Sequence, residues 1–255
     1  MLSTLVIIPT YNEAENLRGA VTNVLDAVGE DVEVLVVDDG SPDGTGRLAD
    51  ELAEADSRVH VLHRSSKQGL GPAYLTGFAW ALERDYGAVM EMDADGSHRA
   101  AHLPRLLDSL ALCDVVLGSR WCPGGRVENW PRHRLLLSRA GNAYARWALG
   151  LSVRDATGGY RAIRTDILRQ ALQRPVSSQG YCFQVDLLRR LLDQGADVIE
   201  VPIIFSDRVR GTSKMSGAIV AEAMLEVTRW ALQRRLAAVR SHLRRRVSEP
   251  PQPIG

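Results

Sequence analysis

The stretch Ala88-Val-Met-Glu-Met-Asp-Ala-Asp-Gly-Ser-His98 joins a short apolar run to a polar cluster that begins where the run ends. A short, mostly apolar run bounded by turn residues is typical of a buried strand. Asp93 and Asp95 follow at positions i and i+2, so their side chains point to the same side of an extended chain. The stretch therefore predicts a strand over 88–92 that presents two carboxylates at its C-terminal end.

The same arrangement, an apolar run followed by polar residues, recurs along the chain. Further runs lie at 5–8, 32–37 and 115–117, and the polar residues after them are Pro9–Glu13, Asp38–Ser41 and Ser119–Trp121. Helical patterns at 13–27, 44–55, 73–82 and 103–110 alternate with these runs and with another at 59–62. Alternation of this kind predicts an α/β domain with a mostly parallel central sheet and helices on both faces. Ligands of such sheets bind beyond the C-terminal strand ends, where the polar clusters fall.

The second half of the chain is less regular. It predicts loops at 123–131, 155–161 and 206–214, helices at 134–149 and 183–193, and a strand at 198–205. A long helical pattern then begins at Gly217, and its last part, Arg229–Arg246, contains seven arginines and no acidic residue. We expect a main domain over 1–216, a basic amphipathic C-terminal helix over 217–246, and a disordered, proline-rich tail over 247–255.

Composition limits the class of protein. Of the 255 residues, 45% are hydrophobic and 24% are charged, and basic and acidic residues are equal in number at 31 each, as in a folded globular domain. The cysteines Cys113, Cys122 and Cys182 have no metal-binding spacing and favour a reducing, cytoplasmic compartment. No basic residue precedes Arg18, so the N-terminal residues are not expected to be a signal peptide. No run approaches the roughly 18 apolar residues of a membrane span. We therefore expect any membrane contact to be peripheral, on the cytoplasmic face.

Asp93 and Asp95 are the strongest candidates for a metal site. Two carboxylates at one strand end can share a cation, and oxygen ligands suit Mg²⁺ or Mn²⁺, which commonly hold substrate phosphates at the same time. Ser97 or His98 would add a ligand or orient a water, although each alone is more often an ordinary loop residue. An isolated Asp-x-Asp pair is weak evidence, and its position after a predicted strand is what favours the metal.

The cluster after the second run has two interpretations. Asp38-Asp-Gly-Ser-Pro-Asp43 is favourable turn chemistry, in which Asp43 caps the helix that follows. Asp38, at the end of the strand, is equally suited to accept hydrogen bonds from a nucleobase or a ribose. Both interpretations can hold, because turn residues can shape the loop while Asp38 binds.

The cluster after the first run is open in the same way. In Pro9-Thr-Tyr-Asn-Glu13, Asn12 or Thr10 is a candidate helix cap. The alternative makes Tyr11 a wall beside a base and Glu13 a polar contact.

Taken together, the motifs carry a resemblance. Pro9–Glu13, Val37–Thr45 and Met92–His98, in that order, resemble the inverting glycosyltransferases of the nucleotide-diphospho-sugar (GT-A) fold. Six further motifs are similar to those of the dolichol- or polyprenol-phosphate mannose synthases: Gly118–Trp121, Asn129–Pro131, Ser138–Asn142, Asp155–Arg161, Gly180–Gln184 and Asp207–Met215. The resemblance implies a single catalytic GT-A domain over 1–216. It also implies transfer of mannose from GDP-mannose to a polyprenyl phosphate, with inversion.

The resemblance implies roles for individual residues. Contacts to GDP-mannose are expected from Pro9, Tyr11, Glu13, Val36, Asp38, Asp39, Asp93, Ala94, Asp95, Arg120, Arg208 and Lys214. The expected catalytic residues are Asp95, Arg120, Arg208 and Lys214. The Mg²⁺ or Mn²⁺ ion is expected at Asp93, Asp95 and Ser97. Ser97 departs from the pattern, because some relatives carry Gln as the metal ligand at this position.

Charge explains why basic residues are expected in the site. The donor diphosphate carries about two negative charges, and the acceptor phosphate carries about 1.5 to 2 at pH 7. Bringing them together costs several kcal/mol at an effective dielectric constant of about 20. A divalent cation on Asp93 and Asp95 would neutralise the leaving diphosphate. Arg120, Arg208 and Lys214 lie in loops with Gly or Ser neighbours and would clamp the acceptor phosphate, whose anionic oxygen does not require a strong general base.

Three alternatives are weighed against this function. One is the same chemistry with another donor, such as UDP-glucose. Another is a non-catalytic, nucleotide-binding scaffold, which would not need to keep both the carboxylate pair and the basic residues. Nucleic-acid binding by the basic C-terminal helix is not expected, because stacking aromatic residues and a recognition motif do not accompany it. That helix either packs on the domain or rests on anionic lipid.

Overall fold

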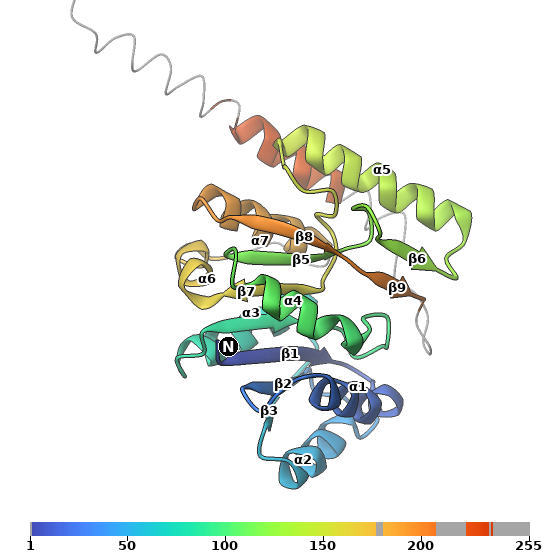
Figure 1. The fold of residues 1–255 in the computed structure, drawn as a ribbon, viewed down its shortest axis with the longest axis vertical. Coiled ribbons are helices and arrows are strands. Elements are labelled where there is room, and N and C mark those ends of the chain that lie inside the picture. Colours follow the sequence, from blue (N-terminus) through green and yellow to red (C-terminus); the bar gives the residue numbers. More distant parts are fainter. Residues whose placement is uncertain (1, 177–180, 208–222, 235, 237–255) are drawn as a thin grey trace, which may run out of the picture.

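The computed structural model describes residues 2–176, 181–207, 223–234 and 236 (Figure 1). The strands are β1 (Thr4–Thr10), β2 (Val32–Asp38), β3 (Val59–His63), β4 (Ala88–Glu91), β5 (Val115–Ser119), β6 (Arg126–Glu128), β7 (Arg161–Arg164), β8 (Val198–Pro202) and β9 (Ile204–Ser206). The helices are α1 (Ala14–Ala27), α2 (Thr45–Ala55), α3 (Leu70–Leu82), α4 (Leu103–Ser109), α5 (Arg132–Leu149), α6 (Thr165–Ala171) and α7 (Tyr181–Asp193), and a 3₁₀ turn, η1 (Ala100–His102), precedes α4.

The central sheet has the strand order β3-β2-β1-β4-β7-β5-β8. The pairs β1–β2, β1–β4, β2–β3 and β5–β8 are parallel. β7 is antiparallel to both of its neighbours, β4 and β5. The mostly parallel sheet expected from the sequence is therefore confirmed, and its parallel strands bring the polar clusters after β1, β2, β4 and β5 to one edge.

Side chains that alternate along β1 pack into two cores, one on each face of the sheet. Val6 and Ile8 pack with α1, α2 and α4, whereas Leu5 and Ile7 pack with α3, α6 and α7. All four side chains are completely buried. Helices on both faces explain why this strand is a continuous apolar run rather than an alternating one.

The structure corrects the sequence prediction in the second half of the chain. The segment 123–131, expected to be a loop, contains β6, and the strand expected over 198–205 is divided into β8 and β9. Pro202 ends β8 because it has no N–H for the ladder, and β9 pairs with β6 in a separate two-stranded sheet. β7 and α6 were not predicted. β7 has only four residues with arginine at both ends, so it lacks the apolar pattern of the other strands.

The predicted C-terminal helix is helical in its described part, 223–234. Val227 and Ala231 are buried in the same core as α3 and α7. The hydroxyls of Tyr144 on α5 and Thr228 form a hydrogen bond of 2.6 Å. Packing on the domain is thus confirmed for this part. The rest of the expected helix and the tail 247–255 lie outside the described residues.

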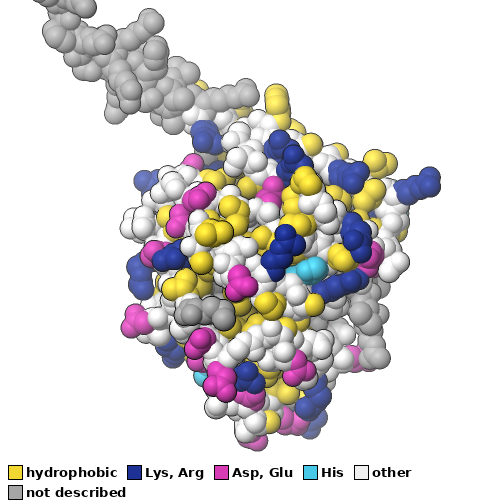
Figure 2. Space-filling view, viewed as in Figure 1, with side chains coloured by type: hydrophobic (Ala, Val, Ile, Leu, Met, Phe, Trp, Pro, Cys, Tyr) yellow, Lys and Arg dark blue, Asp and Glu magenta, His cyan; other side chains and the backbone are white. Residues whose placement is uncertain are grey.

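Part of the surface near these two helices is apolar. The exposed fractions are 65% for Leu136 and 73% for Trp147 on α5, and 71% for Leu225 on the C-terminal helix. Figure 2 shows hydrophobic and basic side chains gathered over this end of the molecule. In the described part of the chain, no helix has both the length and the apolar character needed to cross a membrane.

Candidate active site

The turn after β4 carries the two predicted metal ligands. Asp95 is 5% exposed, and its Oδ1 accepts a hydrogen bond from the Ser97 N–H at 3.0 Å. The backbone N–H of Asp93 donates to Nδ1 of His98 at 3.1 Å. Gly96 closes the turn with a φ of 76°, a conformation that favours glycine. Local hydrogen bonds thus hold the segment 93–98 in one shape at the sheet edge.

The residues of this turn fit a small divalent cation. Such ions usually take one or two protein carboxylates, and water and substrate phosphate fill the other positions. In the described ranges, no group of three or more His, Cys, Asp or Glu side chains could hold a metal. If Asp93 and Asp95 hold a cation, as predicted, they would supply only part of its ligands, and the oxygens of a diphosphate would supply others. The Ser97 Oγ is buried without a hydrogen-bond partner, which a bound polar group would supply.

Beneath the turn lies a buried polar group that the sequence reasoning missed. Glu91 on β4 is fully buried, 3.9 Å from Nε of Arg161, and accepts a hydrogen bond from Gln184 at 3.2 Å. Burial raises the pKa of Glu91 to about 7, against the weaker opposing effects of Arg161 and Gln184. The available signal was a glutamate in the middle of an otherwise apolar run.

Arg161 holds the predicted loop 155–161 in place. Its guanidinium donates to the carbonyl oxygens of Ala156, Gly158 and Gln184 at 2.6–2.7 Å. The side chain is 1% exposed, so Arg161 is a buried residue rather than a surface charge, and its hydrogen bonds connect the loop to α7.

The loops after β1 and β2 are bonded to each other. Asp38 is 3% exposed, and its Oδ1 accepts hydrogen bonds from the hydroxyls of Thr10 at 3.1 Å and Ser41 at 2.5 Å. The Ser41 Oγ in turn accepts the Asn12 N–H at 3.0 Å. The turn interpretation of the cluster 38–43 is confirmed, and Asp38 itself takes part in the turn. Contact between Asp38 and a nucleotide stays a prediction.

The neighbouring carboxylate, Asp39, organises the next loop. It pairs with Arg64, and its Oδ2 accepts the backbone N–H groups of Gln68 and Gly69 at 3.1 Å each. These contacts fix the loop that leads into α3. The Gly69 region is therefore a loop that enters a helix.

Asp43 serves the N-termini of two helices. Its carboxylate accepts the N–H of Thr45, the first residue of α2, at 3.0 Å and the N–H of Ala14, the first residue of α1, at 3.2 Å. Asp43 thus accepts the first N–H of α2, but the N-cap position is occupied by Gly44, so Asp43 is not the cap residue itself. Capping of α1 by Asn12 or Thr10 is wrong, because α1 has no side-chain cap of its own and its partner comes from the second loop.

Tyr11 is half-buried on the first loop. The Nζ of Lys67 lies 4.0 Å from the centre of its ring, a cation–π contact. Glu13 accepts a hydrogen bond from Asn16 at 2.8 Å. The ammonium group of Lys67 thus lies over one face of the Tyr11 ring. Lys67 belongs to the loop that Asp39 organises.

The remaining predicted contacts near the first strands are placed by the sheet and the turn. Pro9 and Val36 belong to β1 and β2. Ala94, which lies between Asp93 and Asp95 in the sequence, is buried. A groove of about 780 Å³ lies between α1 and the segment 94–104, and Ala94 and Asp95 are part of its wall.

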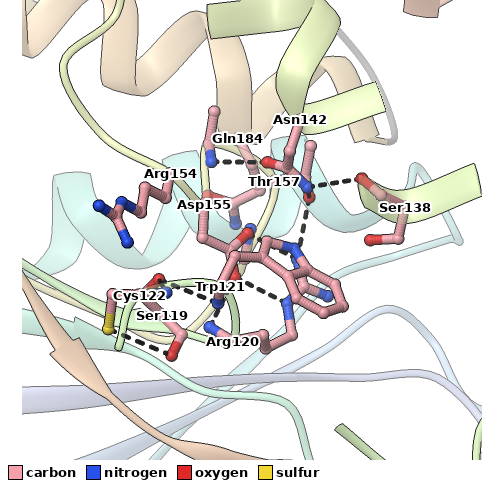
Figure 3. A network of polar contacts seen from close by, with 12 residues as sticks. Ser119, Arg120, Trp121, Cys122, Ser138, Asn142, Arg154, Asp155, Thr157 and Gln184 are labelled. Carbon is pink, nitrogen blue, oxygen red and sulfur yellow. Dashed lines mark hydrogen bonds and ion pairs between the residues drawn. The ribbon is translucent and has the colours of Figure 1, made fainter. Parts of the chain in front are cut away.

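Arg120, at the end of β5, lies in a buried ion pair (Figure 3). Its Nε and one terminal nitrogen donate to the two carboxylate oxygens of Asp155 at 2.8 and 2.7 Å, and its backbone N–H donates to Asp155 at 2.9 Å. Thr157 accepts a further bond from the guanidinium at 2.9 Å. The sequence predicted Arg120 but missed Asp155, which is 1% exposed and fixes the orientation of the guanidinium. Contact between Arg120 and a phosphate stays a prediction.

Phe205 connects this pair to the turn after β4. The centre of its ring lies 5.3 Å from the ring of His98 and 5.3 Å from Cζ of Arg120. Trp121 and Trp130 lie at 5.6 and 5.8 Å from the same guanidinium. The structure thus brings Arg120 and the turn 93–98 together around one aromatic side chain.

Asp186 on α7 is 3% exposed and is paired with Arg189 and Arg190 on its own helix. Arg208 and Lys214 lie outside the described residues, so their roles stay predictions.

Known proteins that are similar to this chain are glycosyltransferases. Residues 5–172 match the model of glycosyl transferase family 2. The chain is 54% identical over 243 residues to the polyprenol monophosphomannose synthase of Mycolicibacterium smegmatis, covering 94% of this chain and 91% of that protein. It is 52% identical over 242 residues to the undecaprenyl-phosphate mannosyltransferase of Micrococcus luteus, covering 95% of this chain and 99% of that protein.

A solved structure shares the fold. The glucosyl-3-phosphoglycerate synthase of Mycobacterium tuberculosis, in complex with Mn²⁺, uridine diphosphate and glucosyl-3-phosphoglycerate, superposes with a TM-score of 0.60 at 22% identity, over 89% of this chain and 77% of that one. At this identity the likeness concerns the fold alone, and it agrees with the GT-A architecture. The family model covers well over half of the sequence, and two relatives exceed 50% identity along nearly all of it. The chain therefore belongs to glycosyl transferase family 2.

Proposed function

We propose that this glycosyltransferase moves mannose from GDP-mannose to a polyprenyl phosphate, with inversion at the anomeric carbon. The observation that carries the proposal is the identity of 54% and 52%, over more than nine tenths of the chain, to two proteins named for mannosyl transfer to polyprenyl lipids. The guanine base of the donor is inferred from the sequence motifs. The metal is inferred from Asp93 and Asp95.

The reaction needs little acid–base chemistry from the protein. A phosphate oxygen of the acceptor attacks the anomeric carbon, and the bond from that carbon to the donor diphosphate breaks. Asp93 and Asp95 would hold a divalent cation, which when bound supplies positive charge beside the leaving diphosphate. Arg120 adds a cation whose orientation Asp155 fixes. The acceptor oxygen is anionic before the reaction, so its attack releases no proton that a base must remove.

The acceptor class is tested with radiolabelled GDP-mannose and two matched lipids. We expect label to pass into undecaprenyl phosphate and not into undecaprenol, because only the phosphate is an anionic nucleophile at neutral pH. Organic extraction separates labelled lipid from unused donor. Transfer to the free alcohol at a comparable rate would show that the acceptor assignment is wrong.

The donor base is tested by titration. We expect GDP to bind more tightly than UDP in the same Mn²⁺ buffer, because the motifs around Tyr11 and Asp38 resemble a guanosine site. Isothermal titration of both nucleotides into one preparation measures the difference. Tighter binding of UDP would favour the alternative donor, UDP-glucose. Absence of binding by either nucleotide would contradict a nucleotide-sugar transferase.

Arg208 is expected to serve the acceptor phosphate. It is far in sequence from the donor clusters, and the loss of one electrostatic contact to the reacting groups costs about 2–4 kcal/mol. Arg208→Ala should therefore lower turnover roughly 30- to 1000-fold. Affinity for GDP should change little, because the nucleoside contacts are expected from the first half of the chain. Normal turnover, or an equally steep loss of GDP affinity, would show that the role is assigned wrongly.

Peripheral contact with the membrane is part of the same proposal. α5 has four arginines, no acidic residue, and the exposed side chains Leu136 and Trp147. Apolar side chains beside cations are the combination that favours the surface of an anionic bilayer.

The contact is tested by sedimentation with vesicles that contain phosphatidylglycerol. We expect the double variant Leu136→Glu/Trp147→Glu to lose most of the bound fraction. Leu112→Glu is the matched control, because Leu112 is 80% exposed in the turn between α4 and β5. Equal binding by the wild type and the double variant would exclude α5 as the contact.

A further inference from the structure

The turn 93–98, which carries the two predicted metal ligands and is termed the metal turn, is closed by the side chain of its last residue, His98. The imidazole of His98 accepts the backbone N–H of Asp93 through Nδ1 at 3.1 Å, across five positions of sequence. The same nitrogen lies 4.0 Å from Oδ2 of Asp93. One ring therefore faces both the main chain and the carboxylate of a predicted metal ligand.

This hydrogen bond determines which ring nitrogen of neutral His98 carries the proton. A ring nitrogen that accepts a hydrogen bond carries no proton, so neutral His98 bears its proton on Nε2. This tautomer leaves a lone pair at Nδ1 for the amide of Asp93.

Packing holds the ring in this orientation. His98 is 3% exposed and stacks on Tyr160 with the ring centres 4.7 Å apart and an angle of 8° between the planes. Phe205 contacts the ring edge-on at 5.3 Å. The hydroxyl of Tyr160 donates to the carbonyl of Arg99 at 3.0 Å, so the stacking partner is itself fixed. A ring clamped on two sides has little freedom to release the amide.

The backbone on either side of the ring is also fixed. His98 forms an antiparallel bridge with Phe205, and the N–H of Ser206 donates to the carbonyl of Ser97 at 3.3 Å. The ring is thus anchored to β9, while its Nδ1 reaches back to the start of the turn.

We propose that His98 is a positioning residue, which acts through Nδ1 as a hydrogen-bond acceptor that fixes the Asp93 end of the metal turn. It is not a metal ligand in this role. Partners that orient the ligands of a metal are typically worth 10- to 100-fold in metal affinity. The proposal rests on the proposed function in so far as Asp93 and Asp95 hold the cation.

Two substitutions separate an acceptor at Nδ1 from mere occupation of space. The amide oxygen of Asn stands the same number of bonds from the backbone as Nδ1, whereas that of Gln stands one bond farther. His98→Asn should therefore restore the bond to the Asp93 amide, and His98→Gln should not. His133→Gln, at an exposed position on α5, is the control for the chemical change alone.

The first readout is hydrogen exchange of the Asp93 amide, measured by NMR without metal or substrate. We expect protection to fall at least tenfold in His98→Gln and to be largely kept in His98→Asn. Nitrogen-15 spectra of the wild type should show the proton on Nε2. A proton on Nδ1, or equal protection of the Asp93 amide in both variants, would overturn the proposal.

The second readout is Mn²⁺ affinity in the presence of GDP. We expect His98→Gln to weaken it 10- to 100-fold, and His98→Asn and His133→Gln to stay within about threefold of the wild type. Equal weakening in both His98 variants, with protection of the amide kept in His98→Asn, would overturn the positioning role. A wild type that binds no Mn²⁺ with GDP would instead refute the proposed metal site. The exchange experiment would still decide whether His98 Nδ1 holds the amide of Asp93.

Discussion

Replacing Asp95 by Asn is expected to lower turnover at least about 1000-fold while the protein keeps its fold. A metal that neutralises a leaving diphosphate contributes several kcal/mol to the transition state, and the neutral amide of Asn is a poor ligand for it. The amide oxygen of Asn can still accept the Ser97 N–H, so the turn should survive the change. Steady-state transfer assays and thermal unfolding on the same preparation measure both effects.

The matched control is Asp108→Asn, the same substitution at an exposed position on α4. It should leave turnover and Mn²⁺ affinity unchanged. Chelation by EDTA should abolish transfer by the wild type, and added Mn²⁺ or Mg²⁺ should restore it. Full turnover of Asp95→Asn in EDTA would rule out metal-dependent catalysis through this carboxylate.

Asp155→Ala should be among the most destabilising single substitutions in the chain. Removing one member of a buried ion pair leaves an uncompensated charge and typically costs about 3–5 kcal/mol. Here the change strands the Arg120 guanidinium and also removes the acceptor of the Gly158 N–H. We expect the urea midpoint of unfolding to fall accordingly, with the m-value unchanged.

An exposed pair provides the control. Asp166→Ala breaks a contact of 3.6 Å with Arg164, but Asp166 has 65% of its side chain exposed, so the loss should be less than about 1 kcal/mol. Equal losses in free energy of unfolding at the two positions would show that the Arg120–Asp155 pair has no special weight.

The same pair predicts a loss of stability in acid. Burial alone raises the pKa of Asp155, but the charge of Arg120 and its hydrogen bonds outweigh burial, so the pKa lies below its ordinary value. A depressed carboxylate pKa stabilises the fold above the unfolded value of about 3.9, and this stability is lost as the pH falls through the folded value. Below pH 4, the free energy of unfolding should therefore fall less steeply with decreasing pH in Asp155→Ala than in the wild type.

The first half of the fold was predictable from short apolar runs. β1, β2 and β4 are buried on both faces, and this burial requires the continuous hydrophobic stretches that mark them in the sequence. The positions of Asp93 and Asp95 followed from the same signal, because the polar residues begin where β4 ends.

The missing parts depend on contacts between distant residues. Asp43 supplies the partner for the start of α1 from 29 positions away, a pairing that local capping rules do not contain. Asp155 meets Arg120 across 35 positions, and each alone has the appearance of a surface charge. Arg161 was missed for the same reason, since its three partners are backbone carbonyls that only the folded chain brings together.

The central claim is mannosyl transfer from GDP-mannose to a polyprenyl phosphate, and one measurement tests it most directly. The folded protein is incubated with undecaprenyl phosphate, Mn²⁺ and one radiolabelled donor at a time, namely GDP-mannose, GDP-glucose, UDP-glucose or UDP-N-acetylglucosamine, and the lipid is then extracted. We predict label in the lipid with GDP-mannose alone, and its loss with Asp95→Asn. Label from UDP-glucose but not from GDP-mannose, or an unlabelled lipid with every donor, would contradict the account.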